Sequence, residues 1–453
     1  MVHTYKQGGY NIAVDVNSGA VHALDDAAYR VLELIPSKPV DDICPQSIID
    51  KLKDVLDADS CKNAYRELFS LAKDGLLFAD DDYIDVNRAF PENPPLKALC
   101  LHISHDCNLR CKYCFASTGD FGTGRKLMTP EIAKAAIDFV IARSQNRRNI
   151  EIDFFGGEPL MAMDSVKQAV EYAKEQGKIH NKNFRFTITT NGLALNQEYI
   201  DYINSEMSNV VLSLDGRPEV NDEMRKTVSG DGSYEYIVPK FKKLIDSRDK
   251  SLDYYVRGTF TRDNLDFTED VLHIADLGFD QLSVEPVTAE EGCLYALQDC
   301  DKEKIFAEYE KLAEIMKERR DFNFFHFMVD LEQGPCVIKR IRGCGAGYEY
   351  AAVTPEGDVY PCHQFVGKEE YRMGNVCDDT FDKKISDEFM GYNICTRESC
   401  KKCWAKFYCS GGCSAANLNM NGNLEDSYEL GCELERKRLE CAIMLKVHDA
   451  LNA

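Results

Sequence analysis

The sequence predicts an α/β protein: a partial (β/α)6 TIM-like barrel with a small domain before it and a cysteine-rich extension after it. Apolar strands alternate with amphipathic helices between residues 96 and 320, and cysteines concentrate after residue 321. Six βα units with short connections are typical of a parallel sheet curled into an incomplete barrel. We therefore divide the chain into residues 1–90, 96–320 and 321–453.

The composition limits the class of protein. Of the 453 residues, 44% are hydrophobic, and no apolar run is long enough to cross a bilayer. Residues 1–6 lack the apolar core of a secretory signal, so we expect a cytoplasmic protein with no membrane partner. Nineteen cysteines in that reducing compartment indicate metal binding or redox chemistry. The net charge of −22 argues against a nucleic-acid partner, because binding phosphates needs clustered Lys and Arg.

Residues 1–90 are expected to form a hairpin followed by helices. Two apolar stretches flank a polar turn that ends in Gly19, a pattern typical of a β-hairpin. Pro91, Pro94 and Pro95 then predict a stiff linker. The expected strands are residues 10–14, 20–24 and 76–78, and the expected helices are residues 25–34, 46–56 and 60–73.

The barrel elements follow from hydrophobic periodicity. Thr129 and Pro130 are an N-cap and a first helical residue for the first barrel helix. Strands are expected at residues 98–103, 150–155, 184–190, 210–214, 254–259 and 281–287. Further helices are expected at residues 164–178, 196–206, 234–247, 266–277 and 301–320.

Glycine and polar residues follow these strands, where active sites of such barrels collect. Gly156-Gly157-Glu158-Pro159 comes after the second strand and Thr190-Asn191 after the third. Ser213 follows the fourth strand, with Arg225 downstream, and Glu285-Pro286 follows the sixth on the expected substrate side. Each stretch alone could be an ordinary turn.

Three cysteines follow the first strand. Cys107, Cys111 and Cys114 form a C-x3-C-x2-C loop with Phe115 beside the last cysteine. Three thiolates are one short of the four that usually hold a 4Fe–4S cluster, so one iron would stay open to a small molecule. A zinc site or reduced structural thiols are the alternatives. The loop resembles the cluster loop of the radical S-adenosylmethionine (SAM) enzymes.

This resemblance implies a cofactor and its site. In radical SAM enzymes the amino and carboxylate groups of SAM chelate the open iron, and electron transfer cleaves SAM to a 5′-deoxyadenosyl radical. The residues that the resemblance assigns to SAM are Tyr113 beside adenine, Gly156, Gly157 and Glu158 at the amino group, Thr190 and Asn191 near the ribose, and Ser213 and Arg225 at the carboxylate.

The C-terminal cysteines form a second motif. Their spacing is C-x12-G-x4-C, then C-x2-C-x5-C-x3-C, then a last cysteine after eighteen residues, and it resembles the SPASM extension of radical SAM peptide-modifying enzymes. A zinc ribbon would need paired C-x2-C knuckles, and only Cys400 and Cys403 form one here.

The resemblance implies two auxiliary clusters, and so three 4Fe–4S clusters in all. The implied ligands are Cys400, Cys403, Cys409 and Cys432 for an outer cluster, and Cys344, Cys362 and Cys413 for an inner cluster with an open iron. Cys336 could fill that position. An open iron is the favoured alternative, because it could bind and deprotonate a substrate thiol.

Residues 1–90 resemble the winged-helix leader-recognition domain of enzymes that modify ribosomal peptides. In that family the peptide leader adds a strand to a sheet edge. Small winged-helix domains also bind DNA, which the acidic residues 80–82 disfavour.

The order of the three parts resembles the thioether-forming maturases, namely sactipeptide and ranthipeptide enzymes, and above all those of "six cysteines in forty-five residues" (SCIFF) peptides. The resemblance implies an oxygen-sensitive enzyme that joins Cys sulfur to carbon in a ribosomally made precursor, reduced by a flavodoxin or ferredoxin. A sulfatase-type maturase forming formylglycine, a carbon–carbon crosslinker and a non-enzymatic electron carrier are the alternatives. The sequence assigns no catalytic base.

Overall fold

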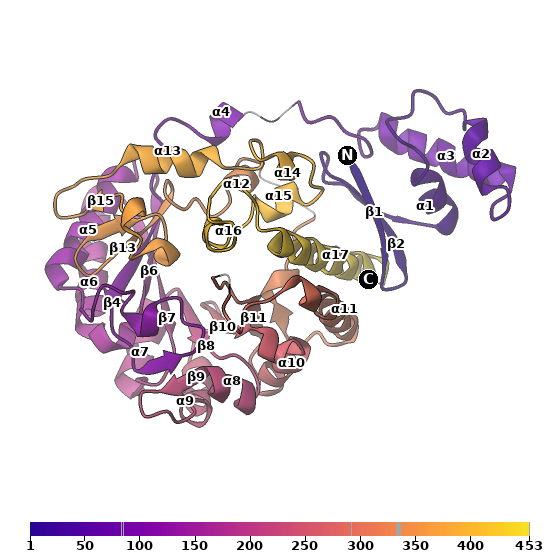
Figure 1. Cartoon of the computed structure of the whole chain (residues 1–453). Helices are drawn as coiled ribbons and strands as arrows, with labels where there is room; N and C mark the ends of the chain where they lie inside the picture. Colours follow the sequence, from indigo (N-terminus) through magenta and orange to yellow (C-terminus); the bar gives the residue numbers. More distant parts are fainter. Residues whose placement is uncertain (83, 85, 291, 332–336, 453) are drawn as a thin grey trace.

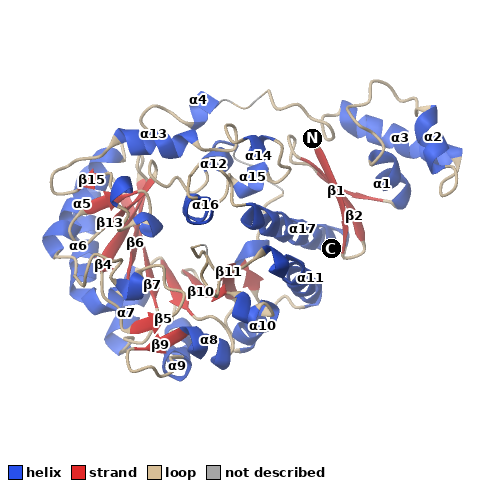
Figure 2. Ribbon diagram, viewed as in Figure 1, coloured by secondary structure: helices blue, strands red, loops and turns tan. Residues whose placement is uncertain are grey.

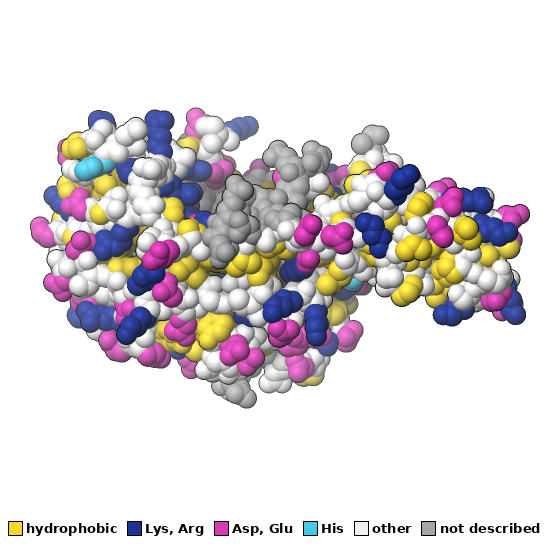
Figure 3. All heavy atoms as spheres, turned by 90° about the horizontal axis from the view of Figure 1, so that it is seen from above, with side chains coloured by type: hydrophobic (Ala, Val, Ile, Leu, Met, Phe, Trp, Pro, Cys, Tyr) yellow, Lys and Arg dark blue, Asp and Glu magenta, His cyan; other side chains and the backbone are white. Residues whose placement is uncertain are grey.

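The computed structural model describes the chain except residues 83, 85, 291, 332–336 and 453. It forms a curved α/β body with a small N-terminal domain at one side, next to the C-terminal helix α17 (Figure 1). The strands of the body lie inside a rim of helices (Figure 2). On the face seen in Figure 3, acidic and basic side chains are interspersed.

The large sheet has the order β12-β11-β10-β8-β7-β6-β4-β13-β14-β15. Its six central strands are parallel and confirm the six predicted strands. They are β4 (Ala98–Ser104), β6 (Asn149–Gly156), β7 (Asn183–Thr190), β8 (Asn209–Ser213), β10 (Asp253–Phe260) and β11 (Gln281–Pro286). In the described part of the chain β12 and β15 are the two edges, so the barrel is incomplete.

The chain after residue 321 also contributes to this sheet. β12 (Asn323–Phe324) pairs in parallel with β11, and β13 (Tyr350–Val353) pairs in parallel with β4. β14 (Asp358–Tyr360) and β15 (Gly374–Asn375) extend that edge antiparallel. The cysteine-rich extension is therefore built directly onto the barrel.

The helices of the barrel agree with the predicted ones. Their bounds are α5 (Pro130–Arg143), α6 (Met163–His180), α7 (Gln197–Glu206), α9 (Tyr234–Asp246), α10 (Phe267–Asp276) and α11 (Lys302–Glu318). The Thr129 side chain accepts from Ile132 N at the start of α5, as predicted. The short α8 (Pro218–Met224) and the paired strands β5 (Leu109–Cys111) and β9 (Arg225–Thr227) were not predicted.

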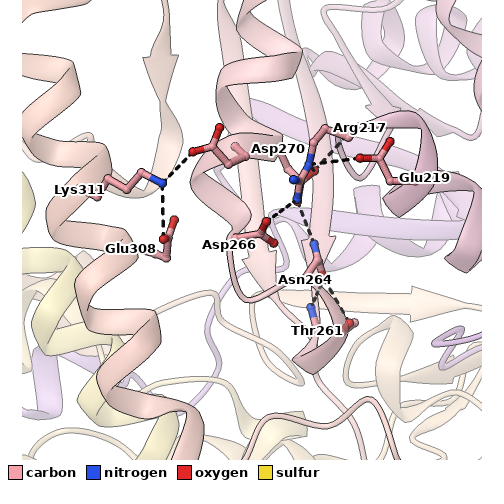
Figure 4. A network of polar contacts seen from close by, with 9 residues as sticks. Arg217, Glu219, Thr261, Asn264, Asp266, Asp270, Glu308 and Lys311 are labelled. Carbon is pink, nitrogen blue, oxygen red and sulfur yellow. Dashed lines mark hydrogen bonds and ion pairs between the residues drawn. The ribbon is translucent and has the colours of Figure 1, made fainter.

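A polar network ties the turn after β8 to the outer helices (Figure 4). Arg217 Nε lies 2.8 Å from Asp270 Oδ1 on α10, and its Nη2 lies 3.0 Å from Asp266 Oδ2. Asn264 Nδ2 also donates to Asp270 over 3.2 Å. Gly216 has a φ of 143° and leaves no room for a Cβ beside Asp270. This packing positions the residues that follow β8.

The N-terminal domain has the sheet order β1-β2-β3, all antiparallel. Its elements are β1 (Val2–Gln7), β2 (Tyr10–Asp15), β3 (Val21–Leu24), α1 (Asp26–Leu32), α2 (Gln46–Leu52) and α3 (Ala58–Lys73). The predicted hairpin is confirmed as β2–β3, whereas β1 was missed. The strand expected at residues 76–78 is wrong, because Leu76 N and Leu77 N both donate to Leu71 O and close the end of α3.

The N-terminal sheet packs on α17 (Glu429–Leu451). Tyr5 Oη donates to Glu440 O over 3.0 Å, and the His3 ring stacks on Trp404 at 4.1 Å between centroids. Ile12 and Val14 are fully buried in the same apolar core as the barrel strands. The helices α1–α3 pack around a separate apolar cluster.

The remaining helices surround the C-terminal cysteines or link the domains. They are α4 (Val86–Ala89), α12 (Val337–Arg342), α13 (Lys383–Gly391), α14 (Glu398–Lys401), α15 (Lys406–Cys409) and α16 (Ser414–Asn421). None of the helices in the described part of the chain is long and apolar enough to span a membrane.

The shared core predicts different effects for two buried residues of the N-terminal domain. Ile12→Ala should cost about 2–5 kcal/mol and speed hydrogen exchange in both the sheet and α17. Leu68→Ala is the control, because Leu68 lies in the separate cluster, and should speed exchange only in α1–α3. Exchange measured by mass spectrometry would contradict this packing if Ile12→Ala left α17 unchanged.

Candidate functional site

The loop with Cys107, Cys111 and Cys114 lies at the C-terminal end of β4. Its strand β5 pairs antiparallel with β9, which sets Cys111 opposite Arg225. Burial raises the pKa of the Cys107 and Cys111 thiols to about 12 and also raises the pKa of Cys114. A bound metal would lower these pKa values again, because coordination deprotonates a thiol outright.

Two glycines let the cysteine loop pack against the turn after β6. Gly157 N donates to Ser104 O over 2.7 Å, and Glu158 N donates to Asp106 O over 2.9 Å. A Cβ on Gly157 would lie 2.3 Å from Asp106 O, and a Cβ on Gly119 would lie 2.5 Å from the Cβ of Cys107. Both positions therefore require glycine.

Glu158 is a buried acceptor in this turn. Its Oε1 accepts from Thr190 Oγ1 over 2.7 Å and from Leu160 N over 3.1 Å, while its Oε2 accepts from Asn191 N over 2.8 Å. Burial raises the pKa of Glu158 to about 7, although these hydrogen bonds oppose the rise. A carboxylate can accept about four hydrogen bonds, so Oε2 has capacity left for one further donor such as an ammonium group.

Asp215 links the residues on the opposite side. Tyr113 Oη donates to both of its oxygens, over 2.9 Å and 2.7 Å, and Arg225 Nη2 donates to Oδ1 over 2.9 Å. The guanidinium of Arg225 also lies over the Tyr113 ring, 5.5 Å from its centroid. Arg225 Nε is buried and has no hydrogen-bond partner in the described part of the chain.

These residues surround one cavity of about 200 Å³ at the C-terminal ends of the barrel strands. All three cysteines of the loop line it, together with every residue predicted to contact SAM, namely Tyr113, Gly156, Gly157, Glu158, Thr190, Asn191, Ser213 and Arg225. The thiols, the spare acceptor of Glu158 and the unpaired donor of Arg225 fit a cluster beside a ligand that carries an ammonium and a carboxylate.

The structure also brings the C-terminal cysteines into the two predicted groups. Beside the effect of burial, the charges of Cys413 and Cys344 raise the pKa of Cys362. Burial raises the pKa of Cys409 to about 11, with smaller contributions from Cys432, Cys400 and Cys403. These interactions show that the members of each group are neighbours. Their role as cluster ligands stays a prediction, and Cys336 lies outside the described residues.

Among the described side chains, no three of the His, Cys, Asp or Glu residues gather closely enough to hold a single metal ion. In a 4Fe–4S cluster each thiolate binds a different iron, so its ligands lie farther apart than those of one ion.

A second cavity of about 640 Å³ adjoins the first. Arg257, Glu285 and His363 line both cavities, and the second reaches Cys409, Cys413 and Cys432. Burial lowers the pKa of His363 to about 4, so it is a neutral residue of the shared wall.

Sequence reasoning missed Arg257 and Asp215 at this site. Arg257 is one residue within a strand, and the importance of Asp215 depends on partners distant in the chain, so neither gives a local signal. Glu285, near the C-terminal end of β11, was expected on the substrate side. It lines both cavities, and its position beside a substrate stays a prediction.

Comparison with known proteins identifies the class. The sequence model of the Radical SAM superfamily matches residues 101–266, and that of the SPASM iron–sulfur cluster-binding domain matches residues 344–404. Over 388 residues the chain is 25% identical to a cysteine-type anaerobic sulfatase-maturating enzyme of Clostridium perfringens, covering 79% of this chain and 99% of that protein.

Two solved structures share the fold. Native anSMEcpe with bound AdoMet and Kp18Cys peptide has a TM-score of 0.62 at 20% identity, over 80% of this chain and 100% of the other. Streptococcus suis SuiB bound to precursor peptide SuiA has a TM-score of 0.54 at 15% identity, over 95% of this chain and 98% of the other.

The chain therefore carries a radical SAM domain followed by a SPASM domain. It is a radical SAM enzyme, and its cofactors are SAM, a 4Fe–4S cluster and additional clusters in the SPASM domain.

The packing of Gly157 predicts the effect of a single methyl group. Gly157→Ala should displace the cysteine loop and lower the iron content by about four per chain, the content of one 4Fe–4S cluster. Iron would be counted after anaerobic reconstitution, with circular dichroism to show that the fold is kept. Gly391→Ala is the matched control, because a Cβ there meets nothing within 4 Å. Equal iron in both variants would contradict the prediction.

Proposed function

We propose that this enzyme installs intramolecular thioether crosslinks between Cys sulfur and a carbon of an acceptor residue in a ribosomally made precursor peptide. The observation that carries the proposal is that the two cavities adjoin and share lining residues. The residues predicted to hold SAM line the first, and Cys413, from the group of three cysteines, lines the second. A peptide in the second cavity would lie between the two sets.

When bound, SAM and its cluster supply a carbon radical that can abstract a hydrogen atom from the peptide. We propose that Cys107, Cys111 and Cys114 hold that cluster and that Arg225 and Glu158 orient SAM. The group of Cys344, Cys362 and Cys413 offers three thiolates, and a substrate cysteine is the fourth ligand that this set lacks. Cys400, Cys403, Cys409 and Cys432 hold the outer cluster in this proposal.

The alternative is another maturase of the same domain order. The similarity to the cysteine-type sulfatase-maturating enzyme fits formylglycine formation as well as thioether formation. Ligation of the inner cluster by Cys336 would favour this alternative or a carbon–carbon crosslinker, because it would leave no position for a substrate thiol.

We further propose that residues 1–90 bind the leader of the precursor. β3 is an edge strand in the described part of this domain, and an extended peptide can add a strand to such an edge. A peptide-bound relative, SuiB with SuiA, matches over 95% of the chain, including most of this domain. Deletion of residues 1–90 is an unsuitable test, because Ile12 and Val14 belong to the core of the barrel.

The function is tested with reconstituted enzyme, SAM, reductant and a cysteine-rich precursor peptide. We expect about twelve irons per chain, as three clusters require, and a loss of two hydrogens for each crosslink. Mass spectrometry after alkylation should show the crosslinked cysteines protected. Modified peptide whose cysteines all remain free to alkylate would overturn thioether formation in favour of a carbon–carbon crosslink. Loss of the sulfur atom of a cysteine from the peptide would overturn it in favour of formylglycine formation.

The leader proposal predicts a local change in hydrogen exchange. Adding the leader peptide to the intact enzyme should slow exchange of the amides of β3, because a new strand would satisfy the free edge. A scrambled leader of equal composition is the control. Protection confined to the barrel, or none at all, would contradict the proposal.

A further inference from the structure

The wall between the two cavities contains an ion pair on neighbouring strands. Arg257 of β10 donates from Nε to Glu285 Oε1 over 3.0 Å and from Nη2 to Glu285 Oε2 over 2.5 Å. The side chain of Arg257 remains 44% exposed, and no hydrogen bond from its Nη1 is found among the described residues. One edge of the guanidinium is therefore fixed, and the other is free to bind a ligand.

Glu285 is held in turn by a chain of hydrogen bonds. Arg438 Nη1 lies 2.9 Å from His326 Nδ1, and His326 Nε2 lies 3.3 Å from Ser283 Oγ. A guanidinium can only donate, so His326 Nδ1 accepts and its Nε2 carries the proton. Ser283 Oγ can then donate to Glu285 Oε1, which lies 3.4 Å away.

The charges in this chain agree with that direction. Burial and the charge of Arg438 together lower the pKa of His326 to about 3, so the ring is neutral. Although burial opposes it, the charge of Arg257 holds the pKa of Glu285 at about 2, so the carboxylate is ionised. Arg438 stands on α17, and the network therefore connects the C-terminal helix to the barrel wall.

We propose that Arg257 binds a main-chain carbonyl oxygen of the peptide segment that passes between the two cavities, with Glu285 as its positioning residue. This inference rests on the proposed peptide substrate. Glu285 already balances the charge of Arg257, so a neutral carbonyl satisfies the free edge of the guanidinium without adding a second negative charge.

The surroundings of Arg257 support a main-chain contact. Much of the second cavity is lined by apolar side chains, namely Pro286, Val287, Ala289, Leu297, Leu434 and Leu439. Such a surface can accept apolar peptide side chains, while the backbone carbonyls still need donors. Arg257 would supply one of them where the peptide enters the first cavity.

The test uses reconstituted holoenzyme and the precursor peptide without its leader, so that leader affinity does not hide the contact. Arg257→Gln should raise both the Kd and the KM for this peptide about tenfold or more, the scale expected for a hydrogen bond from a charged donor. The KM for SAM should change less than about twofold. Arg257→Lys should recover only part of the loss, because an ammonium lacks the planar fork.

Glu285→Gln should raise the KM for the peptide by less than Arg257→Gln does. Glu285→Asp should raise this KM by less than Glu285→Gln, because it keeps the carboxylate. Arg320→Gln is the matched control, because Arg320 pairs with Asp449 on the surface near the other end of α17. Arg257 variants that behave like this control would overturn the inference, and so would a rise in the KM for SAM alone.

The ligand chemistry is tested with altered peptides. A peptide with every Asp and Glu changed to Asn and Gln should keep the full loss in Arg257→Gln. With a peptide whose backbone carbonyl at the contact position is reduced to methylene, Arg257→Gln and the wild-type enzyme should bind equally well. If the loss disappears with the amide peptide, Arg257 binds a carboxylate and the carbonyl assignment is wrong.

The two proposals fail in different ways. Wild-type enzyme that binds the peptide but leaves its cysteines uncrosslinked overturns the proposed function, while the peptide Kd of the variants still tests Arg257. Wild-type enzyme that does not bind the leaderless peptide overturns the Arg257 contact.

Discussion

The close approach of two backbone segments is the constraint on which the site depends. Glu158 N donates to Asp106 O over 2.9 Å, and a Cβ on Gly157 would meet the same oxygen at 2.3 Å. On the other side of the loop, β5 pairs with β9 and brings Cys111 opposite Arg225. The three thiols are thus positioned by backbone contacts on both sides, which vary less than contacts between long side chains.

Helix α17 connects the three parts of the chain. Cys432 lies in its first turns, Arg438 joins the hydrogen-bonded chain to Glu285, and Glu440 O accepts from Tyr5 of the N-terminal sheet. A shift of this helix would therefore move a cysteine group, the cavity wall and the N-terminal sheet together.

The features that the sequence predicted well have local signals. Apolar runs marked the six parallel strands, and cysteine spacing marked residues that the fold brings into one cavity or one group. The missed features depend on distant contacts: β1 is polar along much of its length and is held by β2 and α17, and the partners of Asp215 include Tyr113, 102 residues away. Such pairings become visible only when the strands are placed side by side.

The charge states at the wall bear on what its side chains can do. An efficient general base has a pKa near the working pH, yet the pKa values of Glu285 and His326 are about 2 and about 3. Both groups therefore keep one charge state at neutral pH, Glu285 as a carboxylate and His326 as a neutral ring. Neither side chain is therefore suited to take a proton from a substrate, and their role at this wall is to fix the position of Arg257.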